Sequence, residues 1–75
     1  MEMADVTMHI DETVGHERRT KIADTVRGHN GVMAVAHHDE KPHLMIIEYN
    51  PDAVTSQELL QVVLDQGVHA ELIGL

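Results

Sequence analysis

Apolar and polar residues alternate near the start of the chain, over residues 4–10. Val6, Met8 and Ile10 fall on one side of this segment, and polar residues fall on the other. Alternation with a period of two is typical of a β-strand that buries one face. The other segments rich in strand-forming residues cover residues 32–38, 44–49 and 68–73. The pattern therefore predicts four strands.

Two segments between these strands have the periodicity of helices. Residues 15–27 place Ile22, Ala23 and Val26 on one helical face, and a segment with two glycines follows them. The second helix falls between the third and fourth strands. We therefore expect one helix after the first strand and one after the third.

The second helical segment has the clearer end signals. Thr55 and Glu58 have the spacing of a capping box, which satisfies free N–H groups of the first turn. Gly67 suits the left-handed conformation that ends many helices, so we expect the helix to run through Gln66. The order β-α-β-β-α-β predicts the ferredoxin-like α+β fold. In this fold an antiparallel sheet of order 4-1-3-2 carries both helices on one face, and we expect residues 1–75 to form a single such domain.

The composition limits the classes of function. The 75 residues include thirteen acidic and five basic side chains, a net charge of −8, and a single aromatic residue. This charge repels phosphate backbones and there is almost no aromatic surface for stacking bases, so we expect no nucleic acid partner. No segment is long and apolar enough to span a membrane, so we expect a cytoplasmic protein without membrane insertion. Cysteine is absent, whereas histidine, the commonest metal ligand, occurs seven times.

Four short segments of the chain form a recognisable set: Gly31-Val32 with Val35, Glu48-Tyr49-Asn50-Pro51, Ser56 with Glu58-Leu59-Leu60, and Gly67-Val68-His69-Ala70-Glu71-Leu72. Together they resemble the heavy-metal-associated domain, the small module of copper chaperones and of the N-terminal regions of metal-pumping ATPases. These segments are hydrophobic and turn positions spread over the whole chain. The resemblance implies the same ferredoxin-like fold and a role in metal binding or metal transport.

The chain departs from this family at the motif that binds metal. The family holds a soft ion such as Cu(I) with two cysteines of a Met-x-Cys-x-x-Cys motif, on the loop after the first strand. Counting back from Gly31 places Gly15 and Arg18 at the two cysteine positions. Glycine offers no side-chain donor, and arginine carries a fixed positive charge. The resemblance therefore does not extend to Cu(I) transfer between cysteine pairs.

Histidine and carboxylate side chains remain as candidate metal ligands. They favour Zn(II), Ni(II), Co(II) or Cu(II) over Cu(I). His37 and His43 are expected on the helix side of their strands, as cross-strand neighbours. The first helix begins at the same end of the sheet, so His16 completes a predicted three-histidine site, with Glu12 or Asp39 nearby. Exposed or core-capping histidines are the alternative interpretation.

A second candidate cluster lies on the helix-free face of the predicted sheet. His9, Asp11, His69 and Glu71 fall on the adjacent first and fourth strands. The alternative metal site therefore consists of His9, Asp11 and His69, with Glu71 beside them. A solvated polar face with cross-strand charge pairs accounts for the same residues without a metal ion.

The helix-free face is also more apolar than a sheet that faces only water. Its predicted interface residues are Ala34, Ala36, Leu44, Ile46 and Ile73. Adjacent exposed apolar residues suggest docking of a protein partner or of a second copy of the chain. No catalytic motif is present, so we do not expect an enzyme. Two hypotheses remain: metal binding through histidine and carboxylate ligands, or a domain that has lost metal binding and acts through protein interaction.

Overall fold

The computed structural model describes residues 2–73 and contains the six predicted elements in the predicted order. They are β1 (Ala4–Ile10), α1 (His16–Arg27), β2 (Val32–His38), β3 (Lys41–Tyr49), α2 (Ser56–Leu64) and β4 (Ala70–Ile73). The bounds of β1 and β2 are those that the sequence predicts. By contrast, β3 begins three residues earlier than expected and β4 begins two residues later.

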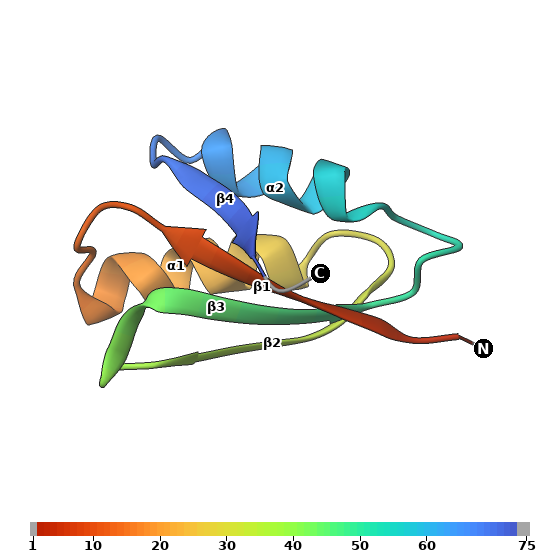
Figure 1. Ribbon diagram of the computed structural model, residues 1–75, viewed down its shortest axis with the longest axis horizontal. Helices are drawn as coiled ribbons and strands as arrows, with labels where there is room; N and C mark the ends of the chain where they lie inside the picture. The colour runs from red at the N-terminus through yellow and green to blue at the C-terminus, as the bar shows by residue number, and fades with distance from the viewer. Residues whose placement is uncertain (1, 74–75) are drawn as a thin grey trace.

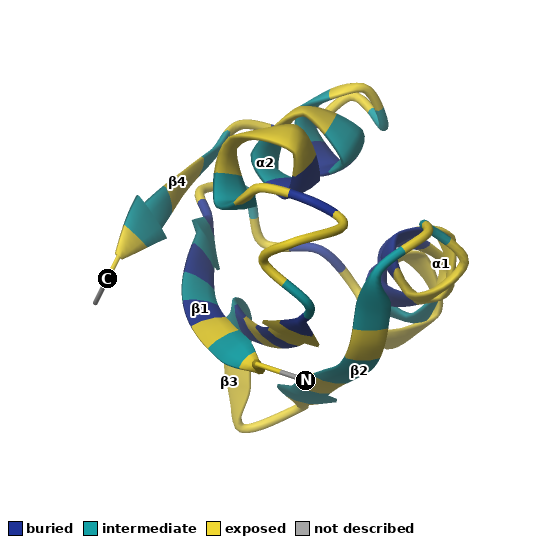
Figure 2. Ribbon diagram, turned by 90° about the vertical axis from the view of Figure 1, so that its right-hand side faces the viewer, coloured by how far each residue is buried: buried dark blue, intermediate teal, exposed yellow. Residues whose placement is uncertain are grey.

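The four strands form one antiparallel sheet in the order β2-β3-β1-β4. This is the predicted order 4-1-3-2 read from the opposite edge, so the predicted fold class is confirmed. Both helices lie on the same side of the sheet, which leaves its other face open (Figure 1, Figure 2). No helix in the described part of the chain is long and apolar enough to cross a bilayer.

The hydrophobic core lies between the sheet and the two helices. In β1 the side chains of Val6, Met8 and Ile10 are at most 1% exposed, while the residues between them are less buried. The other buried apolar residues are Val14, Ile22, Ala23, Val26, Met45, Ile47, Tyr49, Val54, Leu59, Val63 and Val68. Burial of these side chains is the main favourable term in a domain of this size.

The start of α2 follows the signal in the sequence, whereas its end does not. The Thr55 side chain accepts a hydrogen bond from the backbone N–H of Glu58, with an N–O distance of 3.1 Å. Gly67 has a φ of +88°, the left-handed conformation that glycine adopts without strain. The helix itself stops at Leu64, two residues before the predicted end.

The closed end of the β2–β3 hairpin differs from the prediction. His37 lies opposite Met45, and the register then shifts, so that residues 42–44 of β3 have no partner on β2. Pro42 lies in this segment and lacks the N–H that a regular ladder needs. The prediction that His37 and His43 are cross-strand neighbours is wrong, because the bulge displaces His43.

Candidate metal centre

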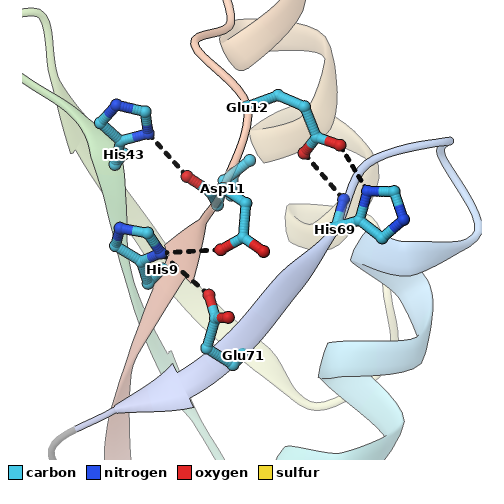
Figure 3. Close-up of polar contacts among 7 residues, drawn as sticks. His9, Asp11, Glu12, His43, His69 and Glu71 are labelled. Carbon is cyan, nitrogen blue, oxygen red and sulfur yellow. Dashed lines mark hydrogen bonds and ion pairs between the residues drawn. The ribbon is translucent and has the colours of Figure 1, made fainter.

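Three ionisable side chains meet on the open face of the sheet. His9 of β1 and Glu71 of β4 are direct partners in the register, and Asp11 follows two residues after His9. Donor atoms of all three side chains lie within 4.8 Å of one another. Within residues 2–73, no other group of three histidine, aspartate or glutamate side chains meets this distance. Figure 3 shows the two carboxylates turned toward the same edge of the His9 ring.

The His9 ring contacts both carboxylates through a single nitrogen. Its Nδ1 atom lies 2.9 Å from Oε2 of Glu71 and 3.1 Å from Oδ1 of Asp11. Ionised carboxylates only accept hydrogen bonds, so the Nδ1 atom carries the proton. The hydrogen bond to Glu71, together with that to Asp11, raises the pKa of His9 above its usual 6.5. The site therefore holds a proton more firmly than a free imidazole does.

The same arrangement fits a metal ion in place of this proton. Transition ions bind nitrogen and oxygen ligands at about 2.0–2.2 Å, which places neighbouring ligands of a tetrahedral ion about 3.4 Å apart. The N–O separations of 2.9 and 3.1 Å need only a small expansion to reach this spacing. The side chains are 39% exposed for His9, 47% for Asp11 and 52% for Glu71. Three donors on an open surface leave at least one coordination position to solvent or to another ligand.

His69, the third member of the predicted open-face site, contacts a different carboxylate. Its Nδ1 atom lies 2.6 Å from Oε2 of Glu12, and its backbone N–H donates to the other oxygen at 2.8 Å (Figure 3). The hydrogen bond from the His69 ring lowers the pKa of Glu12 to about 2, and the same bond raises the pKa of His69. The structure thus brings His9 and Asp11 together with Glu71 and not with His69.

His43 packs against the same group of residues. Its ring is stacked on that of His9, with centroids 5.4 Å apart and an angle of 16° between the planes. Its Nδ1 atom donates to the backbone oxygen of Ile10 at 2.7 Å, because a carbonyl oxygen can only accept. The stacking and this hydrogen bond place His43 beside His9, on the open-face side of the bulge.

His16 and His37, the other members of the predicted three-histidine site, lie next to a buried arginine. Their ring centroids are 6.3 Å apart. Arg19 is 2% exposed and donates from Nε to Nδ1 of His37 at 3.1 Å, and from Nη1 to the backbone oxygen of Val14 at 3.2 Å. Asp39 accepts from Arg19 and also contacts Nδ1 of His16 at 2.9 Å.

This arginine determines what His37 can bind. A nitrogen that accepts from Arg19 cannot also bind an ion, and neutral His37 then carries its own proton on Nε2. Burial, followed by the charge of Arg19, lowers the pKa of His37. His16, His37 and His43 are therefore not assembled into one site. Arg19 was missed at the level of sequence, although its spacing of three residues from Ile22 places it on the buried face of α1.

The two positions that the resemblance assigned to cysteines offer no side-chain ligand. Gly15 has no side chain. Arg18 extends to the turn that follows α2, where its Nη2 atom donates to the backbone oxygens of Gln66 and Gly67 at 3.4 Å. These two carbonyl oxygens satisfy part of the guanidinium, which has donors and no acceptor.

The predicted interface residues share the open face with the candidate metal centre. Ile46 lies opposite both Ala36 and Thr7, and Thr7 lies opposite Ile73. These four residues form a row across all four strands, which we call the apolar row. Ile46 is 42% exposed and Ile73 is 40% exposed. The remaining predicted interface residues, Ala34 and Leu44, lie on the same face beside this row.

Solved structures with metal-related names have the same fold. The chain is similar to oxidised MerP from Ralstonia metallidurans CH34, with a TM-score of 0.87, 14% identity, and coverage of 97% of this chain and 100% of that chain. It is also similar to a putative copper-ion-binding protein from Bacillus anthracis, with a TM-score of 0.83, 20% identity, and coverage of 93% and 97%. A third similar structure is the copper chaperone of Enterococcus hirae in its apo form, with a TM-score of 0.81 and 19% identity. The match covers 91% of this chain and 98% of that chain. No protein-family model and no curated protein matches the sequence. The chain therefore has the βαββαβ fold of heavy-metal-associated domains, in a version that contains no cysteine.

Proposed function

We propose that this chain binds a transition-metal ion through His9, Asp11 and Glu71. The observation that carries the proposal is the convergence of one imidazole nitrogen and two carboxylates on a single point of the open face. Solved structures of the same fold include proteins named for copper binding, which supports a metal-handling role. The site would then have moved from the loop before α1 to the surface of the sheet.

The ligand set selects the class of ion. One nitrogen and two oxygen donors suit Zn(II), Ni(II), Co(II) or Cu(II), whereas Cu(I) prefers thiolate and thioether ligands. The excess of thirteen acidic over five basic residues concentrates cations near the surface. We therefore expect a divalent ion as the cargo of this domain.

The exposure of the site favours binding and release over catalysis. All three side chains are more than one third exposed, so a bound ion would remain accessible to solvent and to other ligands. An enzyme needs a concave site that excludes water around the reacting groups. We therefore propose trafficking of the ion, without a chemical reaction.

An NMR titration of isotope-labelled protein with Zn(II), Ni(II) and Cu(II) at neutral pH tests this proposal. Saturable changes are expected at His9, Asp11 and Glu71, and at the stacked ring of His43. His9→Ala is expected to abolish them. His38→Ala is the matched control, because His38 is an exposed histidine outside the candidate site. No saturable change at millimolar ion would overturn the proposal.

The apolar row supports a second candidate function, a domain that acts only through protein interaction. Two large apolar side chains, Ile46 and Ile73, are each at least 40% exposed on the open face. Self-association of this kind would depend on chain concentration and would not respond to chelators. Sedimentation at several chain concentrations with EDTA therefore separates this candidate from metal binding.

A further inference from the structure

The candidate metal centre and the apolar row lie side by side on the open face. Thr7 belongs to the row, and His9 is the next residue of β1 on the same face. His9 lies opposite Leu44 on one side and Glu71 on the other. Any molecule that covers the apolar row therefore also approaches the metal centre.

Charge keeps two copies of this face apart. Asp5 and Glu48 flank the apolar row on one side, and Asp11 and Glu71 flank it on the other. Four of the five basic residues belong to α1, behind the sheet, and the fifth is Lys41 at the hairpin end. Carboxylates on two facing copies repel one another until a cation neutralises them.

The face is also too small for apolar contact alone to hold two copies together. Four strands about 4.8 Å apart, with about six residues each at about 3.4 Å, give roughly 400 Å² per copy. Two copies would bury about 800 Å², whereas stable interfaces bury at least about 1,200 Å². Association through this face therefore needs a further source of binding energy.

The candidate metal centre is incomplete within one chain. His9, Asp11 and Glu71 supply one donor each, so an ion keeps at least one unfilled position. A facing copy would add a second imidazole and two more carboxylates, enough for a tetrahedral or an octahedral ion. The missing ligands and the missing binding energy would then come from the same contact.

We infer that one divalent transition-metal ion joins two copies of this chain, face to face, with His9, Asp11 and Glu71 of both copies around it. The inference rests on the proposed metal binding at this site. The ion neutralises the carboxylates, and the apolar rows of the two copies then pack beside it. The pairing is a two-fold dimer with one ion for every two chains.

Sedimentation velocity and calorimetry with Zn(II) test this inference. In EDTA the chain is expected as a monomer of 8.4 kDa, and with Zn(II) it is expected at twice this mass. Calorimetry is expected to give half an ion per chain. Zn(II) added in large excess would convert the dimer back into singly loaded monomers, because each chain would then hold its own ion.

Variants separate ion binding from association. Ile46→Glu places a carboxylate in the apolar row and is expected to abolish the dimer while the variant still binds Zn(II), now at one ion per chain. Gln57→Glu on α2 makes the same change of charge on an exposed position behind the sheet, so it is expected to dimerise like the wild type. His9→Ala is expected to lose both properties. Circular dichroism verifies that each variant is folded.

Each contrary result has a distinct meaning. A wild type that binds one Zn(II) per chain and stays monomeric overturns the inference and leaves the proposed function intact. An Ile46→Glu variant that dimerises with Zn(II) like the wild type also overturns the inference, because the contact must then lie elsewhere. A chain that binds no Zn(II) overturns the proposed function itself.

Discussion

Arg19 of α1 contacts His37 of β2 and, after burial, is the second cause that keeps the His37 ring neutral. Its guanidinium is buried and donates to the Nδ1 atom of His37, which can accept only while the ring is neutral. Arg19→Met removes the charge and keeps an unbranched side chain in the same space. The pKa of His37, which is lowered by burial and then by Arg19, is expected to rise toward 6.5 in this variant. An NMR pH titration of the His37 ring measures the change.

Lys21→Met is the control for this experiment, because Lys21 is an exposed cation on the same helix. A His37 pKa that is equal in Arg19→Met and in the wild type would show that burial alone sets it. The sign of the stability effect follows from the lowered pKa. Neutral His37 contributes fully to the free energy of unfolding above pH 6.5, the pKa of the ring in the unfolded chain. This contribution is lost as the pH falls through the lower pKa of the folded state.

Glu12 and His69 form a pair whose pKa values move in opposite directions. The pKa of Glu12 is about 2 in place of 4.5, and that of His69 lies above 6.5. Ionised Glu12 contributes fully to the free energy of unfolding above pH 4.5, and this contribution is lost as the pH falls toward 2. Protonated His69 contributes fully to the same free energy below pH 6.5, and its contribution is lost as the pH rises through its raised pKa. The pair is therefore fully charged between these limits.

Glu12→Gln tests this pair directly. The pKa of His69 is expected to return toward 6.5, because the charge-assisted hydrogen bond that raises it is lost. Titration of the His69 ring by NMR measures the shift. Glu40→Gln, at an exposed carboxylate in the hairpin turn, is expected to leave His69 unchanged. If His69 kept its raised pKa without Glu12, the contact would not be its cause.

At the scale of the elements, a local signal specifies where α2 begins, whereas the helix ends two residues before the predicted Gln66. The Thr55 side chain accepts from the N–H of Glu58, one of the four N–H groups that the first turn leaves free. Thr55→Ala is expected to reduce the free energy of unfolding by about 1 kcal/mol, as measured by urea denaturation. Ser56→Ala, one residue into the helix, removes no such cap and is expected to change stability by less. Equal losses in the two variants would contradict the capping role.

The hairpin shows why some element ends could not be predicted. β1 has one buried face and a period of two, so alternation alone specified both of its limits. At the start of β3 Pro42 interrupts the ladder, and residues 42–44 bulge out. Pro42 is the one residue of this segment that indicates an interruption of the strand ladder. It does not indicate toward which face of the sheet the His43 side chain then turns.

At the scale of the whole molecule, strand order explains how much of the candidate site could be predicted. The order 4-1-3-2 makes β1 and β4 neighbours, which is why His9 and Asp11 were expected beside residues of the last strand. Whether Glu71 or His69 lies beside His9 depends on the residue at which β4 begins. His69 precedes Ala70, the first residue of β4, and its backbone N–H bonds to Glu12. The hydrogen bonds of Arg19 to His37 and Asp39 join α1 to the hairpin. The periodicity of the sequence cannot predict a contact of this kind between side chains.

Ion binding and association together predict that thermal stability depends on both the Zn(II) concentration and the chain concentration. An ion that binds only the folded state adds about 2.7 kcal/mol at a free concentration of 100 times its Kd. For a domain of this size that corresponds to a rise of roughly 10–20 °C in Tm. Because two copies share the ion, a tenfold increase in chain concentration is expected to raise Tm further with Zn(II) and to leave it unchanged with EDTA.

Scanning calorimetry of the wild type and of Ile46→Glu separates the two effects. The variant is expected to keep the rise in Tm with Zn(II), because His9, Asp11 and Glu71 are intact, and to lose the dependence on chain concentration. His38→Ala is expected to behave like the wild type in both respects. A Tm that rises with Zn(II) equally at all chain concentrations would show that each chain binds its ion alone. The dependence of Tm on chain concentration, more than the size of the rise in Tm, therefore distinguishes an ion shared by two chains from an ion bound by one chain.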